Sequence, residues 1–338
     1  MNRRDIVACL LCSSVLLGRV HAQQTGKVYH VAVIGPNVQP SDMSEASHDQ
    51  AMARLFGAFF GELRRLGYVE GKNLVVERYS GEGHVERLRD LASGVVRRNP
   101  DLIYAIGPDL LLALKAATTT IPIVGITSDP VALGIAPSLS RPGGNITGSC
   151  VDVGPDIWGK RLELLNEAVP TLSRLGFIIT TSSLGERGLA LLTEASRERG
   201  ISLVGSPLNS PISEAAYRQS FATMAQEVAD AVFVGDEPEH FIYVRLIAEL
   251  AETSRLPTVY PWREGVEAGG FMAYAFELLD LYRHNADIIA KILAGAKPGA
   301  IPFYQARKFE LSFNLKTAKA LGIEIPGSLL MRADEVIE

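Results

Sequence analysis

The 338-residue sequence is poor in cysteine and has no excess of positive charge. Of its three cysteines, Cys9 and Cys12 lie in an N-terminal segment with the pattern of a leader, which leaves Cys150 alone. A single thiol forms no internal disulfide, so we expect Cys150 to be a buried small side chain. Acidic residues outnumber basic ones by 38 to 33, and the net charge of −5 argues against a nucleic-acid partner.

Motifs of cofactor binding and catalysis are missing as well. The turn after the first expected strand, residues 35–40, lacks the G-x-G-x-x-G pattern, and no G-x-x-x-x-G-K-[ST] occurs. No two histidines are spaced i, i+4, and G-x-S-x-G is absent. We therefore predict no catalytic residues, no cofactor and no metal. The alternative is an exported enzyme, which would need a nucleophile or paired acids, such as Asp129 and Asp236, facing one cleft.

Residues 1–22 have the pattern of a secretory signal peptide. Arg3 and Arg4 supply positive charge, residues 6–17 form an apolar stretch too short to span a bilayer, and residues 20–22 provide the small residues of a cleavage site. We expect cleavage after Ala22 and export to the periplasm of a double-membraned bacterium. An uncleaved anchor is the alternative, and the export route, general secretory or twin-arginine, stays open.

After this segment, apolar strand patterns alternate with helical ones. The spacing of Met52, Leu55, Phe59 and Leu63 predicts a helix over residues 47–67. Near-continuous apolar strands between helices indicate parallel sheets covered on both faces. The pattern predicts two doubly wound α/β lobes in series, separated by a Gly- and Pro-rich break, with later segments that complete both sheets. Expected strands are residues 29–34, 74–79, 102–106, 121–127, 176–180, 201–204, 231–234, 256–260, 270–274 and 309–314.

Most of these strands end in a polar turn that contains Gly, Pro, Ser or Thr. Open α/β sheets bind ligands at this edge, where helix N-termini present free N–H groups to anions. Helix capping explains any one turn, such as Ser128-Asp129-Pro130. The whole set, in an exported two-lobed chain without catalytic motifs, favours a ligand cleft. The turns are residues 35–37, 78–80, 107–109, 127–129, 180–182, 235–237 and 260–262.

Longer segments resemble a known family. Residues 129–134 (DPVALG), 141–148 (RPGGNITG), 160–165 (KRLELL) and the run from 309 to 338 are similar to the ABC transporter substrate-binding family that includes bacterial tryptophan- and tyrosine-binding proteins. The resemblance covers essentially all of residues 28–338. At two positions the chain departs from it: Pro108 and Ala273 stand where relatives often carry Ser or Thr, so two hydrogen-bond donors are absent.

The resemblance implies a periplasmic binding protein type I fold, in which two doubly wound parallel-sheet lobes share a three-segment hinge around the ligand cleft. We place the crossings near residues 148–151, 260–262 and 303–308. Lobe 1 would comprise residues 28–149 and 262–305, and lobe 2 residues 150–261 and 306–338. The implied partners are a small-molecule solute, an ABC permease and its ATPase subunit, and the implied state is a monomer. Hinge closure would capture an amino acid or an aromatic or organic carboxylate without chemistry.

We expect six ligand-binding side chains in this cleft: Asn37, Ser128, Thr181, Asp236, Tyr260 and Tyr274. Two hydroxyls, those of Ser128 and Thr181, would bind a carboxylate together with neighbouring backbone N–H groups. The Asp236 carboxylate would accept hydrogen bonds from an amine or hydroxyl, and the two tyrosines would pack on the apolar part. The alternative function is a sensory protein that presents its ligand to a membrane receptor kinase. Fold and cleft would be the same, and an adjacent permease gene would distinguish the two.

Overall fold

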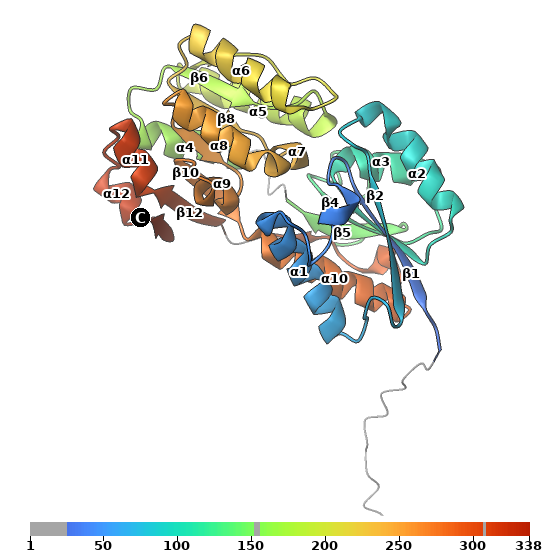
Figure 1. Cartoon of the computed structure of the whole chain (residues 1–338). Helices are drawn as coiled ribbons and strands as arrows, with labels where there is room; N and C mark the ends of the chain where they lie inside the picture. The colour runs from blue at the N-terminus through green and yellow to red at the C-terminus, as the bar shows by residue number, and fades with distance from the viewer. Residues whose placement is uncertain (1–25, 152–155, 307–308) are drawn as a thin grey trace, which may run out of the picture.

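The computed structural model describes residues 26–151, 156–306 and 309–338, which form two α/β lobes (Figure 1). The predicted signal peptide, residues 1–22, lies outside these ranges. Within them, no helix combines the length and the apolar character that a membrane crossing requires. The two doubly wound lobes expected from the alternating pattern are confirmed, because each lobe is built around its own largely parallel sheet.

The first lobe is built on a six-stranded parallel sheet with the order β11-β5-β4-β3-β1-β2. Its strands are β1 (Tyr29–Gly35), β2 (Leu74–Ser80), β3 (Leu102–Ile106), β4 (Ile123–Thr127), β5 (Ile146–Cys150) and β11 (Tyr304–Gln305). Its helices are α1 (Gln50–Arg65), α2 (Leu88–Arg97), α3 (Pro108–Ala117) and α10 (Leu278–Leu293), with short turns η1 (Pro40–Asp42), η2 (Val85–Arg87) and η3 (Pro298–Ala300).

Both faces of the first sheet are buried, which explains its continuous apolar strands. Successive residues of β1 alternate between the two faces. Val31 and Val33 join the core formed with α1 and α10, whereas Ala32 and Ile34 join the core formed with α2 and α3. Cys150, at the end of β5, is 1% exposed, so the prediction of a buried thiol is confirmed.

The second lobe is built on a seven-stranded sheet with the order β13-β12-β10-β9-β8-β6-β7, in which only β12 runs antiparallel to its neighbour β10 among the described pairs. Its strands are β6 (Arg174–Ile178), β7 (Ser202–Val204), β8 (Ala231–Val234), β9 (Thr258–Tyr260), β10 (Met272–Phe276), β12 (Phe309–Asn314) and β13 (Glu335–Ile337).

Helices cover both faces of this second sheet. Those of one face are α4 (Asp156–Ala168), α5 (Ser183–Glu198), α11 (Leu315–Leu321) and α12 (Gly327–Leu330). Those of the other are α6 (Glu214–Gln226), α8 (Val244–Thr253) and α9 (Arg263–Glu267). The five-residue helix α7 (Pro238–Ile242) follows β8 and lies toward the first lobe (Figure 1).

The chain passes from one lobe to the other between β5 and α4, between β10 and α10, and between β11 and β12. The crossing expected near residues 260–262 is wrong. After β9 the chain forms α9 and returns as β10, with Met272 paired to Val259 in the same sheet. Residues 263–276 therefore belong to the second lobe, because the apolar strand β10 fills the place between β9 and β12. The chain leaves that lobe only after Phe276, where α10 begins and packs against α1.

Candidate ligand-binding site

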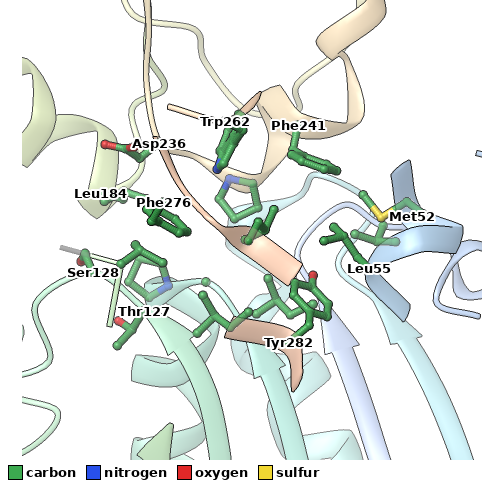
Figure 2. Close-up of a pocket in the computed structure, with 18 residues that line it drawn as sticks. Met52, Leu55, Thr127, Ser128, Leu184, Asp236, Phe241, Trp262, Phe276 and Tyr282 are labelled. Carbon is green, nitrogen blue, oxygen red and sulfur yellow. The ribbon is translucent and has the colours of Figure 1, made fainter. Parts of the chain in front are cut away.

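A cavity of about 640 Å³, counted to its opening, lies between the two lobes (Figure 2). The carboxyl ends of strands from both sheets meet there, as expected for ligand sites of open α/β sheets. The first lobe contributes Val38, Met52, Leu55, Ile106, Gly107, Pro108, Ile126, Thr127, Ser128, Val151, Leu278 and Tyr282. The second contributes Leu184, Asp236, Pro238, Phe241, Trp262 and Phe276.

One part of the cavity is apolar and aromatic. The rings of Phe241 and Trp262 meet edge to face, with centroids 5.3 Å apart, on the second lobe. In Figure 2 they lie across the cavity from Leu55 and Tyr282 of the first lobe. Burial raises the pKa of the Tyr282 phenol, with the nearby Glu264 carboxylate adding to the effect, so the hydroxyl stays neutral at any physiological pH. This part can therefore enclose a flat or bulky apolar group.

The other part is polar. Thr127 and Ser128 stand at the end of β4, and each is 1% exposed. Their hydroxyl oxygens have no hydrogen-bond partner within the part of the chain that the structure describes. Asp236, just after β8, lies at the same end of the cavity, away from Met52 (Figure 2). A buried hydroxyl without a hydrogen-bond partner lowers the stability of the fold unless a bound ligand supplies that partner. The polar part thus offers both donors and a carboxylate acceptor.

The Asp236 carboxylate is held from behind by a buried guanidinium. Arg161 on α4 places its Nη1 2.8 Å and 2.9 Å from the two carboxylate oxygens. Its Nε donates to the backbone oxygen of Tyr274 on β10, at 3.0 Å. The Arg161 side chain is 1% exposed and that of Asp236 is 11% exposed. The opposite charges of the pair offset each other, and of the two residues only Asp236 lines the cavity.

Helix N-termini supply positive potential at the polar end. Helix α3 begins at Pro108 after Gly107, whose φ of +102° suits glycine, and both residues line the cavity. Helix α5 begins after Ser182, whose hydroxyl accepts from the Gly185 N–H. No lysine or arginine is among the described residues that line the cavity. A ligand carboxylate there would be bound by hydroxyls and helix ends rather than by a cationic side chain.

The lobes contact each other around the cavity. Arg54 Nη1 on α1 lies 2.8 Å from Glu267 Oε2 on α9. Ser210, which lies between β7 and α6 of the second lobe, donates from its Oγ to the backbone oxygen of Gly83 in the first lobe at 2.8 Å. Because these contacts join opposite lobes on different elements, the structure represents a closed arrangement.

Within the described ranges, no group of His, Cys, Asp or Glu side chains is arranged to hold a metal ion.

Two of the six residues predicted to bind ligand, Ser128 and Asp236, line the cavity. Asn37 is not among the lining residues, although its neighbour Val38 is, and its buried amide nitrogen has no partner in the described chain. Thr181 is exposed, and its hydroxyl lies 3.5 Å from the Leu208 oxygen. The placement of Thr181 in the cleft is therefore wrong.

The two predicted tyrosines are also misplaced. Tyr260 is fully buried, with its ring packed closely between Gly265 and Gly270. Tyr274 lies against Phe309, with ring centroids 5.5 Å apart, on a groove lined by α4 and α5. In each case the residue that reaches the cavity comes two positions later, Trp262 after β9 and Phe276 at the end of β10. The cavity lies at the carboxyl ends of the strands, whereas Tyr260 and Tyr274 pack into the cores on the two faces of the second sheet.

Other lining residues gave no separate signal in the sequence. Met52 and Leu55 belong to the regular apolar face of α1, and Tyr282 to that of α10, so their spacing indicates core packing alone. Phe241 comes from a short helix that begins at a proline. Only the two-lobed arrangement shows that these apolar faces extend past the core into the cavity.

Comparisons with known proteins agree with this architecture. The family model of the ABC transporter substrate binding protein matches residues 44–337, most of the chain. The chain belongs to this family. A curated relative is the tyrosine-binding protein of Clostridioides difficile, 24% identical over 268 residues that cover 79% of this chain and 76% of that protein. The fold is that of type I periplasmic binding proteins, as its solved neighbours show.

Two of these solved structures match this family member over nearly all of its length. One is a conserved domain protein of Vibrio cholerae, with a TM-score of 0.78 and 25% identity, covering 92% of this chain and 100% of that one. The other is an ABC domain from Streptococcus pneumoniae in complex with L-Trp, with a TM-score of 0.77 and 21% identity, again covering 92% and 100%.

Proposed function

We propose that this chain is the exported solute-binding component of an ABC importer and that it captures an α-amino acid with a large apolar or aromatic side chain. The observation that carries the proposal is that one cavity has a polar end and an apolar, aromatic end. Its polar end holds unpartnered hydroxyls of Thr127 and Ser128 opposite the Asp236 carboxylate, and its other end is walled by Phe241 and Trp262. A zwitterion with an apolar side chain matches both ends at once.

Each ligand group then has a defined place. The ligand carboxylate binds near the hydroxyls of Thr127 and Ser128 and the N-terminal ends of α3 and α5. The ligand ammonium donates to Asp236. The side chain packs between the Trp262 ring and Leu55. The L-Trp in the streptococcal structure and the name of the clostridial relative support this ligand class.

Transport follows from closure of the lobes on the ligand. The ligand leaves unchanged, because the site provides binding groups and the sequence carries no catalytic motif. The closed monomer would dock on a membrane permease, which is powered by its ATPase subunit. The leader pattern of residues 1–22 supports cleavage after Ala22 and delivery to the periplasm.

The direct test is ligand binding by residues 23–338, measured by thermal shift and calorimetry. The panel is L-phenylalanine, L-tyrosine, L-tryptophan and L-leucine, with L-glutamate and L-lysine as charged controls. A ligand at about 100 times its Kd stabilises the folded state by roughly 2.7 kcal/mol, which raises Tm measurably. We expect binding of apolar or aromatic amino acids, recovered unchanged, and none of the charged ones. Binding of the charged pair alone would contradict the proposal.

Variants locate the ligand in the cavity. Trp262→Ala removes one wall of the apolar end, so we expect affinity to fall about tenfold or more. Asp236→Asn removes the acceptor for the ammonium and should weaken binding by a similar factor. Thr181→Ala is the matched control, because Thr181 is exposed outside the cavity and its loss should leave Kd unchanged. Unchanged affinity in both cavity variants would place the ligand elsewhere.

A further inference from the structure

Arg161 is a buried cation with an unusual position on its helix. It lies in the segment 160–165, among the buried leucines Leu162, Leu164 and Leu165, and is itself 1% exposed. The helix could present an apolar side chain here, as its neighbours do. Burying an ion pair carries a large desolvation cost, and such pairs are often no more stabilising than well-packed apolar residues. Its presence therefore calls for a role other than stability.

The contacts of Arg161 fix it at both ends. Nε donates to the Tyr274 backbone oxygen at 3.0 Å, which ties the guanidinium to β10. Nη1 contacts both Asp236 oxygens, at 2.8 Å and 2.9 Å. With one edge of the guanidinium tied to the backbone, the other edge has little freedom to swing. The two contacts hold the Asp236 carboxylate in one orientation, and Asp236 itself lines the cavity.

We infer that Arg161 is a positioning residue that selects for an ammonium on the ligand, by holding the Asp236 carboxylate in a fixed orientation beside the cavity. The inference rests on the proposed function, since it takes Asp236 as the ammonium acceptor. Arg161 does not touch the ligand itself, because it is absent from the cavity lining. Without the guanidinium contacts, the carboxylate can rotate away from the direction in which it accepts from an ammonium, and the preference for that group falls.

The test compares two ligands that differ only in the amine, L-phenylalanine and 3-phenylpropanoate. Their Kd ratio measures ammonium selection, whereas a general loss of fold weakens both ligands alike. In the wild-type chain we expect L-phenylalanine to bind at least about tenfold more tightly. In Arg161→Met and in Asp236→Asn the ratio should fall toward one. In Arg161→Lys, which keeps the charge but cannot span both partners, it should be intermediate.

Arg78→Met is the matched control. Arg78 has the same pattern of contacts in the first lobe, with Nε donating to the Met43 oxygen at 2.8 Å and Nη1 2.7 Å from Glu70, away from the cavity. It should leave the ratio unchanged. If Arg161→Met does not fold, the comparison is made in the Asp236→Asn background with Arg161→Lys. There the arginine has lost its carboxylate partner, so its replacement should have no further effect on the ratio.

Two results separate the inference from the function on which it rests. If the wild-type chain discriminates but Arg161→Met or Arg161→Lys keeps the full ratio, Arg161 is only structural and the inference is overturned. If the wild-type chain binds neither ligand, or binds both equally, Asp236 is not an ammonium acceptor. The proposed ligand class then fails, and the inference fails with it.

Discussion

The buried acid Glu239 predicts that the stability of this protein depends on pH. Glu239 is 6% exposed at the start of α7 and lines a small cavity between the lobes that Asp109 also lines. Burial raises the pKa of its carboxyl from 4.5 to about 7. The carboxylates of Glu237 and Asp109 add to this rise, and His240 opposes it. The folded protein therefore binds this proton more tightly than the unfolded chain does.

The sign and size of the effect follow from linkage. The stabilisation is fully present below about pH 4.5, where the unfolded chain is also protonated, and it is lost as pH rises through about 7. At about 1.4 kcal/mol per pH unit, the difference between the two pKa values corresponds to roughly 3.5 kcal/mol. Glu239→Gln keeps the shape but cannot ionise. It should abolish this part of the pH dependence and make the variant more stable than the wild type at pH 8.

The assay is urea denaturation followed by far-UV circular dichroism at pH 5, 6, 7 and 8, for the wild type and Glu239→Gln. Between pH 5 and pH 8 the wild type should lose about 2.5 kcal/mol more of its free energy of unfolding than the variant does. Glu249→Gln on the exposed side of α8 is the control and should follow the wild type. Equal pH slopes in the wild type and Glu239→Gln would refute the reasoning, because Glu239 would then ionise without cost.

Three further predictions concern closure and packing. Arg54→Ala removes the ion pair with Glu267 across the lobes, so the ligand off-rate should rise by up to about fivefold at low salt and less at high salt, since exposed pairs contribute about 0.2–1 kcal/mol. Stopped-flow release measures this, and Arg65→Ala, which breaks a pair with Glu62 inside α1, should leave it unchanged. Gly148→Ala should lower the free energy of unfolding by more than about 2 kcal/mol in urea melts, because at φ +146° its Cβ would lie 2.0 Å from the Gly125 oxygen. Gly57→Ala in α1, with nothing within 4 Å, should instead stabilise by about 0.5–1 kcal/mol, and a loss there would contradict this account.

The sequence pattern predicts the two α/β lobes, because each sheet is buried on both faces and its strands are therefore continuously apolar. Continuous apolar strands such as β3 and β4 leave few other arrangements, and the helical face of α1 ends within a few residues of its prediction. The crossing after Phe276 could not be found this way. A proline after Tyr260 has the pattern of a boundary, but β10 is apolar enough for either sheet. Only strand pairing decides which sheet receives it.

The sequence predicts which turns lie near the cavity, but it does not predict which side chains line it. Ser128 follows β4 directly and Asp236 is the second residue after β8, so the rule of strand carboxyl ends finds them. Tyr260 and Tyr274 each stand two residues before the residue that lines the cavity, Trp262 or Phe276. Their own rings pack into the cores on the two faces of the second sheet. The rule identifies an edge of a sheet. Which side chains near that edge line the cavity depends on how the two lobes pack, and no residue pattern in the sequence reports this packing.

The distribution of groups between the lobes makes ligand binding and closure a single equilibrium. The hydroxyl donors and the Leu55 wall belong to the first lobe, whereas the Asp236 acceptor and the Trp262 wall belong to the second. Under the proposed function, each end of the ligand is therefore bound from both sides only when the lobes meet. A ligand shifts a two-state equilibrium only by its difference in affinity for the two states. Because an open lobe offers only its own share of the contacts, the contacts that the ligand gains from the other lobe are the part of the binding free energy that favours the closed form.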